Sequence, residues 1–138
     1  MPKAKNKLQE KWQPVLFPHH KHHWKKAYKR IRAKLSAWKS EYGLELENVI
    51  LSQYGLPCCY CGTVLKVKTM SLDHKTPRFR GGSNDLANVE IICKKCNTRK
   101  GILSKKTYES FLDYIWNFNE IDQKYFLRKM GSKDKFGG

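Results

Sequence analysis

The amino-acid sequence predicts a small α+β protein in which helices flank a central unit held together by a metal ion. The chain has 138 residues, enough for one compact domain and little more. Apolar residues recur at helical spacing both before residue 45 and after residue 103. Between these stretches, four cysteines form two C-x-x-C pairs, a spacing that is typical of metal sites.

The chain is strongly basic. Its 28 Lys and Arg residues and 12 Asp and Glu residues give a formal net charge of +16. Residues 1–40 carry net +11 and residues 58–101 carry net +6. Such an excess indicates a polyanionic partner. Because 40% of the residues are hydrophobic, we expect a folded basic protein and not a disordered basic tail.

No segment has the composition of a transmembrane helix or a secretory signal. The longest uncharged run, residues 48–65, contains Gly55, Pro57 and Gly62, whereas a spanning helix needs about 20 mostly apolar residues. The basic N-terminus has no apolar stretch behind it. We expect no membrane association and a reducing location such as the cytoplasm, where closely spaced cysteines bind metal more often than they form disulfides.

Residues 24–39 predict an amphipathic, basic helix. Its apolar stripe consists of Trp24, Ala27, Tyr28, Ile31, Leu35 and Trp38. Seven basic residues and no acid lie mainly on the other faces, which favours nucleic-acid contact over a merely solvated face. The candidates to hold flanking phosphates are Lys25, Lys26, Lys29, Arg30 and Arg32.

Three further helices are expected. One spans Leu46 to Tyr54 and ends at Gly55. Another begins at Ser104 or Thr107, and a shorter one follows it. The stripe of the second is Tyr108, Phe111, Leu112, Ile115 and Phe118; that of the shorter helix is Ile121, Tyr125 and Leu127. We expect these aromatic residues to form core, the alternative being a platform for base stacking.

The paired cysteines are the strongest chemical signal. Cys58 and Cys61 form one pair, Cys93 and Cys96 form the other, and 31 residues separate the pairs. Four thiolates complete the tetrahedral shell of a structural Zn²⁺. The alternatives are two redox dithiols or ordinary buried thiols. Cys59 is expected to be a free, partly buried thiol.

A longer motif includes the second cysteine pair. Residues 71–101 read SLDHKTPRFRGGSNDLANVEIICKKCNTRKG. The order D-H, P, G-G, N and C-x-x-C-N-x-x-K-G resembles the HNH endonuclease family, in the subgroup whose ββα-metal unit is braced by a four-cysteine zinc site. The resemblance covers about residues 56–103 and implies the strands of the α+β prediction.

The resemblance implies a role for four residues. His74 is the general base, Asp73 and Asn97 are metal ligands, and Asn88 fixes the loop and orients the base. The chemistry fits independently, because a neutral imidazole suits a base near neutral pH. Carboxylate and amide oxygens suit Mg²⁺ or Mn²⁺ better than Zn²⁺ or Ni²⁺. Some family members have His where this sequence has Asn97.

Strand geometry imposes a condition on this site. Neighbouring residues of a strand face opposite sides, so Asp73 and His74 can reach one phosphate only if the strand ends or bends there, which Pro77 permits. Gly81 and Gly82 predict a turn, formed either for close approach to nucleic acid or as ordinary turn chemistry. A histidine group could hold a second metal or could be solvated or phosphate-facing; it consists of His19, His20, His22 and His23.

The sequence therefore predicts a metal-dependent DNA endonuclease that acts on double-stranded DNA. Further candidates for phosphate contact near the site are Arg78, Arg80, Lys94, Lys95, Arg99 and Lys100. The expected organisation is a basic helical DNA-binding extension (1–45), a catalytic core (46–103), C-terminal helices (104–130) and a flexible tail (131–138).

Two other functions stay open at this point: a non-catalytic zinc-ribbon nucleic-acid-binding protein, and an RNA-directed nuclease. The sequence also leaves open whether one strand or both are cut and whether the protein is a monomer or a homodimer. By analogy alone, a small chain of this kind suits a phage or mobile element.

Overall fold

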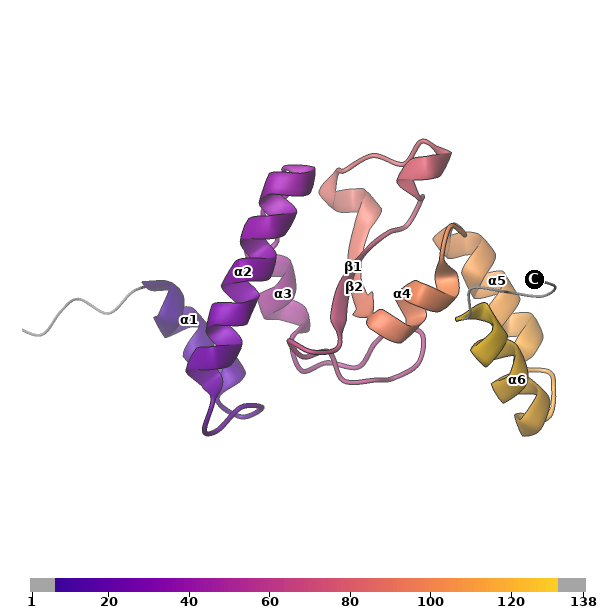
Figure 1. The fold of residues 1–138 in the computed structure, drawn as a ribbon, viewed down its shortest axis with the longest axis horizontal. Coiled ribbons are helices and arrows are strands. Elements are labelled where there is room, and N and C mark those ends of the chain that lie inside the picture. The colour runs from indigo at the N-terminus through magenta and orange to yellow at the C-terminus, as the bar shows by residue number, and fades with distance from the viewer. Residues whose placement is uncertain (1–6, 132–138) are drawn as a thin grey trace, which may run out of the picture.

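Six α-helices and one two-stranded sheet form the part of the chain that the computed structural model describes, residues 7–131 (Figure 1). Side chains are described from Glu10 onward. The predicted α+β class is confirmed. The predicted tail lies outside the described residues from position 132. The helices are α1 (Lys7–Leu16), α2 (Trp24–Tyr42), α3 (Glu47–Gln53), α4 (Lys94–Lys100), α5 (Lys105–Ile115) and α6 (Glu120–Met130). Within residues 7–131, no helix has the length and apolar character needed to cross a membrane.

The sheet separates two groups of helices. Strand β1 (Met70–His74) pairs antiparallel with β2 (Val89–Cys93), with Met70 opposite Cys93 and His74 opposite Val89. Helices α1 to α3 lie on one side of the sheet in Figure 1, and α4 to α6 lie on the other. Because side chains alternate along a strand, Leu72 packs with residues of α2 and α3, whereas Asp73 pairs with Lys100 of α4.

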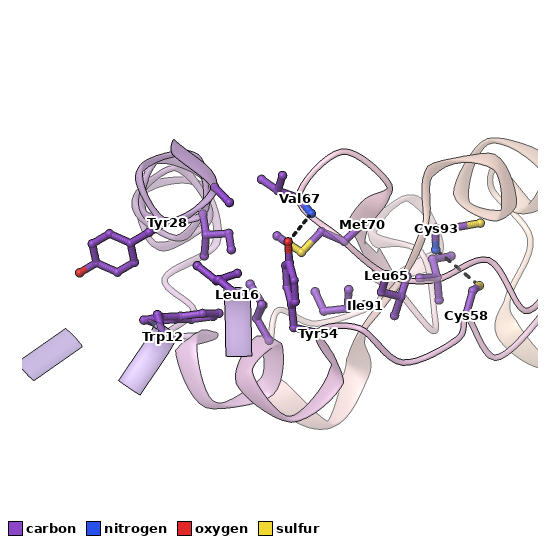
Figure 2. Close-up of a cluster of buried hydrophobic side chains, with 14 of the residues drawn as sticks. Trp12, Leu16, Tyr28, Tyr54, Cys58, Leu65, Val67, Met70, Ile91 and Cys93 are labelled. Atoms are coloured by element: carbon purple, nitrogen blue, oxygen red, sulfur yellow. Dashed lines mark hydrogen bonds between the residues drawn. The ribbon is translucent and has the colours of Figure 1, made fainter. Parts of the chain in front are cut away.

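The largest core cluster joins the N-terminal helices to the sheet. Figure 2 shows Trp12 and Leu16 of α1 among the core side chains, with Tyr54 and Ile91 beside them. The stripe expected for α2 is confirmed, because Ala27, Tyr28 and Ile31 are buried and Trp24, Leu35 and Trp38 pack against the core. The N-terminal third is thus part of the same folded unit as the sheet.

Helix α1 was not predicted from the apolar pattern. Trp12 and Leu16 are 1% and 0% exposed, so both contribute fully to the core. They are four residues apart, which places them on one face of a helix. The helix contains Pro14 and few other apolar residues, so its sequence shows only a short stripe.

The C-terminal helices form a second apolar cluster. Tyr108, Leu112 and Ile115 of α5 are buried against Met130 of α6, and Tyr60 links this cluster to the cysteine loop through ring contact with Tyr108 at 4.9 Å between centroids. Ser104 caps α5, because its side chain accepts a hydrogen bond from the Thr107 N–H. The predicted core role is confirmed for Tyr108, Phe111, Leu112 and Ile115, whereas Phe118 lies beyond the end of α5.

The stripe expected for α6 is wrong in part. The helix has 11 residues, as many as α5, so it is not the shorter helix. Ile121 and Tyr125 are 80% and 47% exposed. The buried face instead carries Phe126, Leu127 and Met130. These residues follow helical spacing, whereas Leu127 does not lie on one face with Ile121 and Tyr125.

A neutral histidine connects α3 to the segment before α2. The Tyr54 hydroxyl accepts a hydrogen bond from the Val67 N–H at 3.1 Å, drawn in Figure 2, and lies 2.5 Å from His20 Nε2. The hydroxyl can donate to Nε2 only when this nitrogen is unprotonated. Burial, together with the Lys66 ammonium, lowers the pKa of His20 below its ordinary value of 6.5.

Protonating His20 should therefore destabilise the fold. Its folded pKa lies below the unfolded value, so its contribution is present above pH 6.5 and is lost as pH falls below 6.5 toward the folded value. In the variant His20→Gln, the amide oxygen accepts from Tyr54 but does not titrate. We expect the melting temperature of the native protein to fall more between pH 7.5 and pH 5 than that of the variant. Equal losses would show that His20 does not carry the effect.

Candidate functional site

The end of β1 gathers the residues that the sequence singled out. A pocket of about 210 Å³ is lined by Asp73, His74 and Asn97, and also by Tyr42 and Arg78. Strand β1 ends at His74, which meets the condition under which the neighbours Asp73 and His74 can reach one site. Asp73 comes from the face toward α4 and His74 from the face toward α2, and both reach the pocket where the strand stops. Asn97 comes from α4, four residues into that helix.

His74 is held from two directions by residues that the sequence did not indicate. Its Nε2 lies 2.9 Å from Asn84 Oδ1, and because an amide oxygen only accepts, Nε2 carries the proton. In the neutral ring, Nδ1 is then the nitrogen that can accept a proton. The Tyr42 ring contacts the imidazole edge-to-face at 5.1 Å between centroids, and the Arg78 guanidinium lies 5.6 Å from the centre of the same tyrosine ring.

The signals for these two residues were different. Tyr42 lies four residues beyond Trp38, so it extends the apolar stripe of α2 by one helical turn. Asn84 lies in the irregular segment between β1 and β2, and no spacing in that segment distinguishes it from Ser83 or Asp85.

Asp73 is a buried carboxylate with one free oxygen. Oδ1 accepts a hydrogen bond from Lys100 Nζ at 3.1 Å, whereas Oδ2 is buried without a partner. Burial raises the pKa of Asp73 above its ordinary value, and the Lys100 ammonium acts in the opposite direction. An unsatisfied buried carboxylate oxygen is costly unless something pairs with it. Oδ2 is therefore available to bind a cation.

Asn97 presents a second oxygen to the same pocket. Its side-chain nitrogen donates to the Leu72 carbonyl at 3.3 Å, which fixes the amide orientation and leaves Oδ1 as the atom that could bind a cation. Carboxylate and amide oxygens are the ligands that Mg²⁺ and Mn²⁺ prefer. The residues present therefore fit a hard divalent cation.

Asn88 closes the loop that follows His74. Its side chain accepts from the Thr76 N–H at 2.9 Å and donates to the Thr76 and Ser83 carbonyls at 3.1 and 2.7 Å. The imidazole itself donates its hydrogen bond to Asn84 Oδ1. Asn88 thus fixes the loop, as predicted from the resemblance, but its side chain bonds backbone groups of the loop and not the His74 imidazole. Gly82 closes the same loop, because a Cβ there would collide with the Thr76 carbonyl, as expected for ordinary turn chemistry.

The four paired cysteines converge at the other end of the sheet. The Sγ atoms of Cys58, Cys61, Cys93 and Cys96 all lie within 4.8 Å of one another. A tetrahedral Zn²⁺ with bonds of about 2.3 Å places its sulfurs about 3.8 Å apart. Backbone N–H groups also point at these sulfurs: Cys93 N–H donates to Cys58 Sγ at 3.5 Å and Cys96 N–H to Cys93 Sγ at 3.4 Å. The cluster therefore fits a structural zinc ion.

Comparison with known proteins agrees with this geometry. Residues 58–102 match the family model described as HNH endonuclease. These residues form an HNH endonuclease domain. The chain is also similar to the CRISPR-associated endonuclease Cas9 of Actinomyces naeslundii, with 39% identity over 51 residues. That alignment covers 36% of this chain and 5% of the relative, so the chain spans a small part of the relative's length.

The HNH domain does not contain the whole pocket. Tyr42 lies outside residues 58–102, and it reaches His74 from the last residue of α2. The structure also places Lys105 outside the domain, where its ammonium pairs with Glu90 of β2 at 2.7 Å. Helices α2 and α5 therefore support the domain from both flanks.

The predicted phosphate contacts differ in exposure. Lys100 is fully buried and bonds Asp73 and the His74 carbonyl, so the prediction that it contacts phosphate is wrong. Arg99 is half-buried. The remaining candidates are exposed: Lys25, Lys26, Lys29, Arg30, Arg32, Arg78, Arg80, Lys94 and Lys95.

Two other predictions are settled by position. Cys59 is exposed, so the expectation of a partly buried thiol is wrong, and it is not one of the four cysteines whose sulfurs converge. Among the described residues, the four cysteines form the one group of His, Cys, Asp and Glu side chains arranged for a metal ion. The histidine group therefore does not form a second metal site there.

The adjacent cysteines provide a matched test of the zinc site. A structural Zn²⁺ contributes roughly 10 to 16 kcal/mol in small metal-dependent folds, which is comparable to the whole stability of about 5 to 15 kcal/mol of a domain. We expect Cys58→Ser to abolish zinc binding and cooperative thermal unfolding, whereas Cys59→Ser retains both. Metal content by mass spectrometry and melting by circular dichroism measure the two effects. A folded, zinc-free Cys58→Ser protein would contradict the assignment.

Proposed function

We propose that this protein is a metal-dependent endonuclease that hydrolyses phosphodiester bonds of double-stranded DNA. The observation that carries the proposal is the convergence of Asp73, His74 and Asn97 on one pocket, with Asp73 Oδ2 buried and unpaired. The HNH domain supports nuclease chemistry in general. The strongly basic composition supports a nucleic-acid substrate.

Each residue of the pocket has a distinct role in this proposal. His74 Nδ1 takes a proton from the attacking water, while Asn84 holds Nε2–H and so fixes the tautomer. Asp73 Oδ2 and Asn97 Oδ1 would hold Mg²⁺ or Mn²⁺. When bound, the cation stabilises the negative charge that develops on the phosphate and on the leaving 3′ oxygen. Arg78 lines the same pocket and contributes a fixed positive charge.

The buried Lys100 supports the metal ligand. Its ammonium donates to Asp73 Oδ1 and to the His74 carbonyl, so it holds two consecutive residues of the strand end in place. With Oδ1 occupied, Oδ2 is left for the cation. The products should carry a 5′ phosphate and a 3′ hydroxyl, and the zinc cluster should serve the fold and not the reaction.

Plasmid cleavage tests the proposed base. Incubation of supercoiled plasmid with the protein and Mg²⁺ or Mn²⁺ should give nicked or linear DNA. General-base catalysis contributes about 10²- to 10⁴-fold, so His74→Ala should lose at least 10²-fold in rate. His22, an exposed histidine, provides the control variant His22→Ala, which should cleave at the native rate.

Three outcomes would contradict the proposal. Equal cleavage by His74→Ala would exclude this base. Specific DNA binding without cleavage by either protein would favour the non-catalytic binding module. Faster cleavage of a matched RNA duplex would assign the protein to RNA.

Replacing Tyr42 tests the contribution of α2 to the pocket. Tyr42→Phe keeps the ring that contacts His74 and Arg78, whereas Tyr42→Leu removes it. Because misplacing a catalytic group by about 1 Å can cost about 10²-fold, we expect Leu to lower kcat by about 10-fold or more and Phe to stay near the native value. Thermal melting checks that both variants fold. If Phe and Leu lose equally, the ring contact is not what matters.

A further inference from the structure

A second pocket lies at the beginning of α2, at the opposite end of that helix from Tyr42, which contacts His74. It has a volume of about 210 Å³ and is formed by the segment before α2, by one face of α2, and by the turn that precedes β1. Its lining side chains are His20, His23, Lys26, Ala27, Arg30, Val67 and Lys68. Three are cations, two are imidazoles and none is acidic. Three of the seven thus carry positive charge in a small volume.

The three cations of this pocket have no ion-pair partner among the described side chains. The ion pairs found among the described side chains include neither Lys26 nor Arg30 nor Lys68. Lys66 adds to the field, since it, Lys68 and Arg30 all act on the His20 imidazole. Cations held close together repel one another unless an anion lies between them. The same charge makes a bound metal ion unfavourable.

The start of α2 adds to the same field. His23 occupies the N-cap position without a side-chain cap, and the first turn contains no acidic residue. The first N–H groups of a helix are unpaired and carry partial positive charge, which favours an anion nearby. Most helices neutralise this end with Ser, Asp or Glu. Helix α2 has 19 residues, long enough to carry the full partial positive charge of a helix N-terminus.

We propose that this pocket binds a backbone phosphate of the nucleic-acid substrate, at a distance from the bond that is cut. The inference rests on the proposed function, because a nucleic-acid substrate is a polyanion that can extend from the first pocket along the surface of the protein. The walls come from two chain segments that Tyr54 links, because its hydroxyl bonds both His20 and the Val67 N–H. The pocket is open to solvent through its exposed cations, which suits a phosphate on a continuous strand.

Helix α2 sets the spacing between the two contacts. The pocket uses residues from His23, the N-cap of α2, to Arg30, and the last residue of the helix, Tyr42, lines the catalytic pocket. At about 1.5 Å per residue, these positions lie about 18 to 28 Å apart along the helix. A duplex advances about 3.4 Å per base pair. A strand that follows α2 is therefore held about five to eight base pairs from the scissile phosphate.

The experiment compares two double variants of equal charge. Arg30→Gln with Lys68→Gln removes one cation from each wall of the pocket. Lys106→Gln with Lys124→Gln removes two exposed cations from α5 and α6 as the control. Both are made in the full, zinc-loaded chain carrying His74→Ala, so that bound DNA stays intact. Fluorescence anisotropy then gives the Kd for labelled duplexes of increasing length at several salt concentrations.

We expect the pocket variant to lower the salt slope by about 0.9, the value for one lost phosphate contact, and the control to keep the slope. The parent protein should gain affinity once the duplex can reach both pockets, and the pocket variant should lose this gain. An unchanged slope, an equal loss in the control, or a persistent gain with length would overturn the inference. Failure of the parent protein to bind any duplex would instead overturn the proposed function.

Discussion

Four sulfur atoms within 4.8 Å of one another determine how the central unit is assembled. As thiolates they would repel strongly unless a cation lay between them, so their convergence fits a metal site. Two of them are at the start of α4, where Cys93 is the N-cap and Cys96 lies in the first turn. Fixing these two positions sets both the direction and the rotation of α4. The next residue, Asn97, and Lys100 one turn later are then directed toward the end of β1.

The ion pair between Lys100 and Asp73 connects this scaffold to the pocket at the end of β1. Both side chains are removed from water, at 0% and 5% exposure. A buried pair gains little in net stability, but loss of one partner costs about 3 to 5 kcal/mol, because the other charge remains buried. The pair therefore contributes more by orienting the Asp73 carboxylate than by stabilising the fold. It gives the two oxygens of Asp73 different surroundings, one bonded to Lys100 and one unpaired.

The parts of the structure that could be predicted are those set by local sequence. Cysteine spacing predicted the cluster, and apolar periodicity predicted α2, α3 and α5. The contacts of Tyr42 and Asn84 with His74 could not be predicted, because they join segments 32 and 10 residues apart whose approach depends on packing. Lys100 was misassigned for a similar reason: in sequence it is one of many basic residues, and only the fold shows that it is buried.

The packing of the sheet also determines which segment of the chain can fold as a unit. Residues 58–102 carry the family match, yet one face of their two strands is covered by α2 and α3, which lie before them. Excised alone, this segment would expose Leu72, Val89 and Ile91 to water and would lose the ring of Tyr42. The segment that determines the chemistry is therefore shorter than the segment that folds. A transplant into another protein would have to supply a replacement for both helices, and the replacement would set the surroundings of His74.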